Sequence, residues 1–261
     1  MRGLPATVRD PTFQFADDIT NSTSALNVDQ LRKQLEDNFD SIQSFCVERD
    51  LMVNTGKTQC IILKLPTKKI DTELELNLNN HTIKASSSVD LLGLTIDQHL
   101  SFKEHIERIS KKCHGLLGVI SKSRHILPLK LLKLTYTALV RPHLEYCSLI
   151  TACASKTNRN KLDVVQKIAS RIIFNEARDA HAAPLLQKLG LQSLDERRTL
   201  KILKTVDKIL DNKCHPYLTN MFSLDNDGLV ANNESFRTTF GKKRFSIYAK
   251  DLYNNFLSNH Y

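Results

Sequence analysis

Apolar residues in the first hundred positions follow two different spacings. Where they alternate or cluster with β-branched residues, we expect strands, because side chains two positions apart share one face of a strand. Runs of this kind predict strands at 60–65, 73–78 and 89–96. Residues 12–19 are expected to form a short hairpin with the exposed carboxylates of Asp17 and Asp18 at its tip, and with Phe13 and Phe15 packed on the helix that follows. Between this hairpin and the first strand, apolar residues recur every three or four positions from Val28 to Phe45. This spacing predicts one amphipathic helix over about 28–48, with Asn27 as its N-cap and Gln30 as the reciprocal partner of the cap.

From residue 101 onward the spacing is helical for more than a hundred positions. Capping boxes at Ser101–Glu104 and Ser193–Glu196 predict two helix starts, since the Ser side chain accepts from the third helical N–H. Pro128 fits the first turn of another helix, which we expect to be kinked or interrupted at Pro142 because proline lacks a backbone N–H. A further helix is predicted over 162–173.

These patterns predict an α+β fold in which hairpins and one helix precede a helical region. We place the boundaries at 1–100, 101–210 and 211–261, the last being a mixed tail with a turn at 225–228. At 261 residues the chain is long enough for one large domain or for two small ones, each able to bury a core.

The net charge of +9 is concentrated in the helical region. Residues 101–210 carry 21 Lys and Arg against 9 Asp and Glu, whereas residues 1–100 carry 10 against 14 and residues 211–261 carry 6 against 5. Such an excess is typical either of a solvated helical surface or of a face that binds a polyanion.

Several classes of function lack their usual sequence signatures. The six cysteines include no Cys-x-x-Cys pair, which disfavours a zinc ribbon or a redox dithiol. No His-x-x-x-His or Gly-x-Ser-x-Gly motif points to a hydrolase. No run has the length of a membrane span, and the opening residues lack the apolar stretch of a signal peptide, so we expect an intracellular protein, cytoplasmic or nuclear, with no membrane partner.

An ordered series of motifs carries a family resemblance. Phe15-Ala16-Asp17-Asp18 is followed by the helix, by Asn54-Thr55-Gly56-Lys57-Thr58, and by Leu91-Leu92-Gly93-Leu94. Further on come Arg141-Pro142-His143-Leu144-Glu145-Tyr146 and the helix from Leu162 to Ile173. In this order the segments resemble the reverse transcriptases of non-long-terminal-repeat retrotransposons, from Phe15 to about Phe256.

The resemblance implies a fold and a set of roles. Residues 1–100 would be part of a polymerase palm and residues 101–210 a thumb-like bundle. Asp17 and Asp18 would hold Mg²⁺ for two-metal nucleotidyl transfer, with Lys57 near the triphosphate. Leu92 and Gly93 would form the primer grip, a positioning element. The partners would be an RNA template and a DNA primer, or their hybrid.

Two departures from the family pattern qualify this picture. The other palm aspartate belongs to a motif upstream of the Asp-Asp turn, and Asp10 is the only acid among the 16 residues before Asp17. Phe102 stands where the family has tryptophan, and the chain has no tryptophan at all. We therefore expect a carboxy-terminal fragment that does not polymerise DNA unless another chain supplies the missing amino-terminal half.

Two other functions remain open at this point. The basic region could be a nucleic-acid-binding module without chemistry, holding duplex phosphates. Its candidate contacts are Lys103, Lys111, Lys112, Lys122, Arg124, Lys130 and Lys133. Alternatively the helices could form a protein-interaction scaffold, which basic residues dispersed around every helix would favour.

Overall fold

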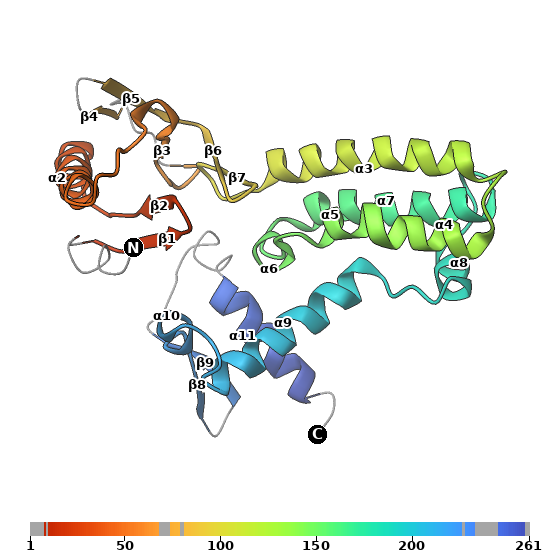
Figure 1. Cartoon of the computed structure of the whole chain (residues 1–261). Coiled ribbons are helices and arrows are strands. Elements are labelled where there is room, and N and C mark those ends of the chain that lie inside the picture. Colours follow the sequence, from red (N-terminus) through yellow and green to blue (C-terminus); the bar gives the residue numbers. More distant parts are fainter. Residues whose placement is uncertain are drawn as a thin grey trace. The chain divides into compact units, whose positions relative to one another are not determined.

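The structure is a computed structural model that describes residues 8, 10–67, 74–78, 81–225, 228–232 and 245–258. The chain divides into two compact units (Figure 1). The first comprises Met1–Asp90 and Asp97–His99, and the second, here the helical unit, comprises Leu91–Ile96 and Leu100–Tyr261. Helices and strands are both present, consistent with the predicted α+β class.

The first unit contains short strands and one long helix. Its elements are β1 (Thr12–Phe15), β2 (Asp18–Asn21), α2 (Val28–Val47), η1 (Thr55–Lys57), β3 (Cys60–Ile61), β4 (Glu75–Leu78) and β5 (His81–Ser86). The predicted helix is confirmed as α2, and the Asn27 side chain accepts from the Gln30 N–H at 2.8 Å. This cap satisfies one of the N–H groups that the first helical turn leaves without a partner.

Two apolar clusters hold α2 in place. Leu74, Leu76 and Leu78 are two positions apart and all buried, and they pack with Phe39 of α2. The alternation that predicted a strand at 73–78 therefore also predicted its buried face, although residue 73 lies outside the described residues. The second cluster joins Ile42, Phe45 and Cys46 of α2 to Val8.

Two strand predictions differ from the structure, and one strand was not predicted. The run at 60–65 pairs with β5 only at Cys60 and Ile61, because the N–H of Lys64 donates to the carbonyl of Gln98 instead. Strand β5 was not predicted, yet it lies between β3 and β4. The single strand predicted at 89–96 is wrong, because the chain turns at Leu92 and Gly93 and forms a hairpin of β6 (Ser88–Leu91) and β7 (Leu94–Asp97).

The helical unit continues from β7 into a series of helices, several of which run alongside one another in Figure 1. They are α3 (Lys103–Ser123), α4 (Leu129–Thr135), the π-helical segment η2 (Tyr136–Val140), α5 (Arg141–Glu145), α6 (Ser148–Thr151), α7 (Lys156–Phe174), α8 (Ala182–Lys188) and α9 (Leu194–Leu210). The end of the chain adds α10 (Pro216–Thr219), β8 (Phe222–Asp225), β9 (Gly228–Ala231) and α11 (Phe245–Ser258).

Of the two predicted capping boxes, one forms. Ser193 accepts from the N–H of Glu196, and the Glu196 carboxylate accepts from the N–H of Ser193, so α9 begins as predicted. At α3 the N-cap is Phe102, in the left-handed region with φ 55°, and the box predicted there is wrong. Phe102 is buried in the main core and takes the N-cap position, while Ser101 Oγ accepts from the N–H of Lys103 at 3.3 Å instead of forming the predicted box.

The predicted interruption at Pro142 takes the form of a π-helical segment. η2 ends at Val140, and Pro142 occupies the first turn of α5, where its missing N–H costs nothing. Tyr136 and Val140 of η2 are fully buried against α3 and α7 residues such as Cys113 and Val165. A second core packs α9 and α11 around β8 and β9, which pair antiparallel on either side of the predicted turn; residues 226 and 227 of that turn lie outside the described residues.

Candidate functional site

Asp17 and Asp18 lie at the tip of a tight hairpin. β1 and β2 pair antiparallel with Phe15 opposite Asp18, so Ala16 and Asp17 form the turn, and Ala16 has a φ of 53°. Both carboxylates are exposed, and within the described residues neither forms a side-chain hydrogen bond or ion pair. The expectation of a hairpin with exposed carboxylates is confirmed.

The expected packing of Phe13 and Phe15 on α2 is wrong. Both rings are exposed, at 47% and 67% of their surface. The buried face of the hairpin is the opposite one, where Thr12 and Asn21 pair and Asn38 of α2 donates to Asn21 Oδ1 at 3.1 Å. Because side chains two apart share a face, this polar contact turns both phenylalanines toward solvent.

The residues around the hairpin do not complete a two-metal site. Asp10 precedes Thr12, the first residue of β1, while the Asp-Asp turn follows Phe15, the last. At 3.3 Å per residue the strand alone separates them by about 10 Å. The Asp10 carboxylate accepts instead from the Asn38 side chain at 2.8 Å. Within the part of the chain that the structure describes, no three His, Cys, Asp or Glu side chains are placed to hold a metal ion. Asp17 and Asp18 alone therefore do not fit the pair of cations that nucleotidyl transfer requires.

The backbone of Lys57 is held in a short helical turn. It closes the 3₁₀ turn η1, in which the Asn54 side chain accepts from the Lys57 N–H at 3.2 Å. Its ammonium group is exposed and joins neither Asp17 nor Asp18 within the described residues. The structure thus presents this lysine to solvent on an ordered turn.

The Leu92–Gly93 turn is fixed to the helical unit by two side chains. Leu92 and Gly93 both have positive φ, 49° and 80°, which suits the tight turn of a two-residue hairpin. Arg108 of α3 donates to the carbonyl of Gly93 at 2.9 Å, and the Tyr146 hydroxyl donates to the carbonyl of Leu92. The predicted primer-grip residues are therefore held by α3 and by the turn after α5.

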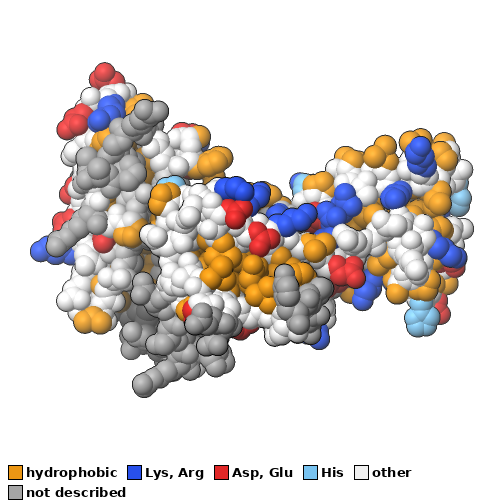
Figure 2. Space-filling model, turned by 90° about the horizontal axis from the view of Figure 1, so that it is seen from below, with side chains coloured by type: hydrophobic (Ala, Val, Ile, Leu, Met, Phe, Trp, Pro, Cys, Tyr) orange, Lys and Arg blue, Asp and Glu red, His pale blue; other side chains and the backbone are white. Residues whose placement is uncertain are grey.

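Six of the seven predicted basic residues lie in α3 or α4, and Arg124 directly follows α3. Lys103, Lys111, Lys112, Lys122 and Lys130 are exposed, while Arg124 and Lys133 are half-buried. From Lys103 to Lys122 the helix rises about 28 Å. Lys111 and Lys122 share one face, since 11 residues make about three turns, whereas Lys103 and Lys112 lie on its two flanks. Without distinguishing these residues from other cations, Figure 2 shows a row of Lys and Arg side chains beside a hydrophobic patch.

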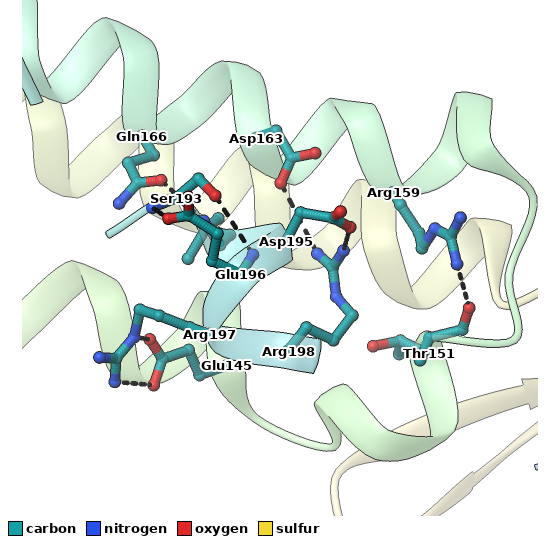
Figure 3. Close-up of polar contacts among 12 residues, drawn as sticks. Glu145, Thr151, Arg159, Asp163, Gln166, Ser193, Asp195, Glu196, Arg197 and Arg198 are labelled. Carbon is teal, nitrogen blue, oxygen red and sulfur yellow. Dashed lines mark hydrogen bonds and ion pairs between the residues drawn. The ribbon is translucent and has the colours of Figure 1, made fainter. Parts of the chain in front are cut away.

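Several polar residues from the family-like segments make internal contacts (Figure 3). Glu145 accepts two hydrogen bonds from Arg197 of α9, one of them at 3.0 Å, and this pairing raises the pKa of the Arg197 guanidinium. The amide of Gln166 donates to the carbonyl of Gln192 and accepts from the N–H of Leu194. These side chains attach α9 to α5 and α7.

The structure thus brings together some predicted residues and separates others. It joins Leu92 and Gly93 to Tyr146, two family-like segments more than fifty positions apart. It leaves Asp17, Asp18 and Lys57 without mutual contacts. Arg108 and Arg197 were not predicted, because their partners lie 15 and 52 positions away and no local spacing identifies them.

Comparison with known proteins shows similarity to two polymerases of transposable elements. The chain is 23% identical over 188 residues to the "Probable RNA-directed DNA polymerase from transposon BS" of Drosophila melanogaster. The aligned region covers 70% of this chain and 20% of that protein. It is 24% identical over 187 residues to the "RNA-directed DNA polymerase from mobile element jockey" of Drosophila funebris, covering 67% of this chain and 20% of that protein. The chain thus matches about a fifth of the length of either polymerase.

No protein-family profile matches the chain, and no solved structure matches it. Among the described residues no helix is long and apolar enough to cross a membrane. The order of the motifs and the two alignments point the same way: this chain is related to the RNA-directed DNA polymerases of transposable elements.

Proposed function

We propose that this chain is the nucleic-acid-positioning part of an RNA-directed DNA polymerase of a non-long-terminal-repeat retrotransposon, and that it does not polymerise DNA alone. The observation that carries the proposal is the Leu92–Gly93 turn, which Arg108 and Tyr146 hold on a basic helical unit. A turn that positions a primer end must keep its place while the strand moves past, and two side-chain donors provide that rigidity.

Its partners would be an RNA template and a DNA primer, held through their phosphates. The excess of Lys and Arg in residues 101–210 supports this choice, because sequence-independent binding depends on cationic side chains. Asp17, Asp18 and Lys57 are the residues that the family resemblance assigns to chemistry. Since the described residues supply too few carboxylates for two cations, we assign no Mg²⁺ to this chain by itself.

A crosslinking experiment tests the primer-grip role. Leu92 is replaced by p-benzoylphenylalanine, and the variant is irradiated with a labelled RNA template–DNA primer hybrid. We expect crosslinks to the primer strand within a few nucleotides of its 3′ end. Val164 of α7 is a matched control, because both side chains are 45% exposed, and we expect no crosslink from it. A hybrid that binds but does not crosslink at position 92, or that crosslinks equally at 164, would contradict the assignment.

The charge of residues 101–210 also favours a second function, a nucleic-acid-binding module with no primer grip. The same experiment separates the two. The module predicts crosslinks spread along both strands, whereas a primer grip predicts a position fixed relative to the 3′ end.

A further inference from the structure

A cavity in the helical unit lies beside α9, at the Glu145–Arg197 contact and away from the candidate primer grip. Its volume is about 470 Å³, and it is lined by side chains of α9, α5 and α6, among them Glu145, Ser148 and Arg197. None of the seven basic residues predicted from the sequence lines it. The cavity is therefore a separate candidate for binding.

One face of α9 carries a row of cations along this cavity. Arg197, Lys201, Lys204 and Lys208 all line it and follow one another at steps of four, three and four residues. This spacing places them on one face of a helix. The row is about 16 Å long at 1.5 Å per residue. One strand of B-form nucleic acid carries a charge about every 3.4 Å of its axis, so the row matches about five consecutive phosphates.

The three lysines of this row are free to bind. Their side chains are exposed, and within the described residues none of the three ammonium groups forms a hydrogen bond or ion pair. Asp207 follows Lys204 by three positions but makes no ion pair with it in that same part of the chain. Arg198, in contrast, is buried and neutralised by Asp163 and Asp195.

The acid in the cavity wall is already neutralised. Glu145 accepts two hydrogen bonds from Arg197 and lies 3.9 Å from the Arg141 Nε. A carboxylate that lies between two guanidinium groups repels a phosphate less than an unpaired carboxylate would. The lining therefore remains positive overall.

The cavity also contains a hydroxyl group without a partner. Ser148 lines the wall, is only 4% exposed, and its Oγ has no hydrogen-bond partner within the described residues. Buried hydroxyl groups in proteins are nearly always hydrogen-bonded, so an unpaired one calls for an explanation. The Oγ atom itself exposes less than 1 Å², so a ligand in the cavity does not reach it, and the case for the site rests on the cations.

We propose that the face of α9 formed by Arg197, Lys201, Lys204 and Lys208 binds the sugar-phosphate backbone of a nucleic acid strand. The inference rests on the proposed function and adds a site to it. Contacts of this kind fix the position of a strand and carry no sequence information. The row is continuous over three turns of one helix, whereas the cations of α3 are spread over its face and both flanks.

The test compares two triple variants of the full chain by fluorescence anisotropy, with a labelled RNA–DNA hybrid and a labelled single-stranded RNA. In the first variant Lys201, Lys204 and Lys208 become Gln. In the control the exposed lysines Lys156, Lys167 and Lys188 become Gln, which removes the same charge from the same unit. All six side chains are exposed, so both variants should fold, which circular dichroism will check.

We expect the first variant to lose affinity and salt dependence together. On a B-form duplex each phosphate contact adds about 0.9 to the steepness with which log affinity falls with log salt concentration. Three lost contacts therefore lower the steepness by about 2.7. The fold loss of affinity between 50 and 200 mM salt should then be about 40 times smaller than for the wild type. On single strands the decrease is about 0.7 per contact. The control variant should keep the wild-type slope.

Each other outcome has a definite meaning. If the wild-type chain binds and both triple variants weaken equally, or neither does, the α9 site is wrong while nucleic-acid binding stands. If polyglutamate competes as well as polyuridylate of equal charge, the face is a general polyanion site and the inference is also wrong. If the wild-type chain binds no nucleic acid, it is the proposed function that fails.

Discussion

The buried ion pair of Asp163 and Arg198 shows how single residues connect α9 to α7. The Arg198 side chain is 4% exposed, and its guanidinium lies 3.6 Å from Asp163 Oδ1 and 2.9 Å from Asp195 Oδ1. Burial raises the pKa of the Asp163 carboxyl above its ordinary 3.8, and Arg198 opposes this shift only in part. Asp163 Oδ1 has no hydrogen bond in the described residues, which is consistent with a raised pKa of this carboxyl.

This raised pKa predicts a pH dependence of stability. Between pH 3.8 and the higher folded pKa of Asp163, the folded chain binds a proton more readily than the unfolded chain. The contribution of Asp163 to the free energy of unfolding should therefore fall as the pH rises through that window, and level off above it. Urea unfolding of the wild type and of Asp163→Asn across the window measures the difference.

Asp195→Asn is the control for this prediction, because Asp195 pairs with the same arginine but its side chain is 69% exposed. The wild-type stability relative to Asp163→Asn should decrease with rising pH, and the Asp195→Asn comparison should not show that trend. A difference that increases with pH would contradict the account of Asp163.

At the scale of elements, replacing glycine by alanine should change the free energy of unfolding in opposite directions at Gly93 and Gly118. Gly93 has a φ of 80°, where an alanine is strained, so Gly93→Ala should lower the free energy of unfolding by about 1–2 kcal/mol. Gly118 lies within α3, and a Cβ there would meet no atom within 4 Å. Gly118→Ala should raise the free energy of unfolding by about 0.5–1 kcal/mol, since alanine favours the helix.

Chemical denaturation of both variants checks this pair. The two substitutions add the same methyl group, so their opposite signs isolate the backbone conformation. If both variants shift stability in the same direction, either the turn at Gly93 or the helix at Gly118 is wrongly described.

The elements that the sequence predicted best are those with a strong local signal. α2 and α9 combine apolar periodicity with side-chain caps at Asn27 and Ser193, and both helices begin where these caps predict. The β6–β7 hairpin was missed because Val89 to Ile96 is a mostly apolar run in which only Gly93 marks a turn. The start of α3 was missed because Phe102, which the fold buries in the main core, takes the N-cap position that the sequence assigned to Ser101.

The candidate site was predictable in part for a similar reason. The positions of Asp17 and Asp18 follow from a local hairpin, and the structure places them as expected. The exposure of Phe13 and Phe15 depends on Asn38, which is 17 residues from Asn21 and reaches it only through the fold. The contacts of Tyr146 and Glu145 likewise join segments that sequence spacing alone does not relate.

At the scale of the whole molecule, the account predicts binding without chemistry. The purified chain should extend no oligo(dT) primer on a poly(rA) template with Mg²⁺ or Mn²⁺, because one pair of carboxylates compensates too little of the repulsion between two cations. Incorporation of labelled dTTP measures this, with Asp17→Ala as the control. Template-dependent incorporation that Asp17→Ala abolishes would show that another carboxylate completes the site.

The most direct test of the central claim is the affinity of the wild-type chain for a labelled RNA–DNA hybrid, measured by fluorescence anisotropy at about 50 and 200 mM salt. We predict saturable binding at the lower salt that weakens at least about tenfold at the higher, because phosphate contacts release counterions. Replacing Lys111 and Lys112 by Glu should weaken hybrid and random duplex alike, since no base edge is read. No binding at the lower salt, or binding that salt does not weaken, would contradict a role in positioning nucleic acid.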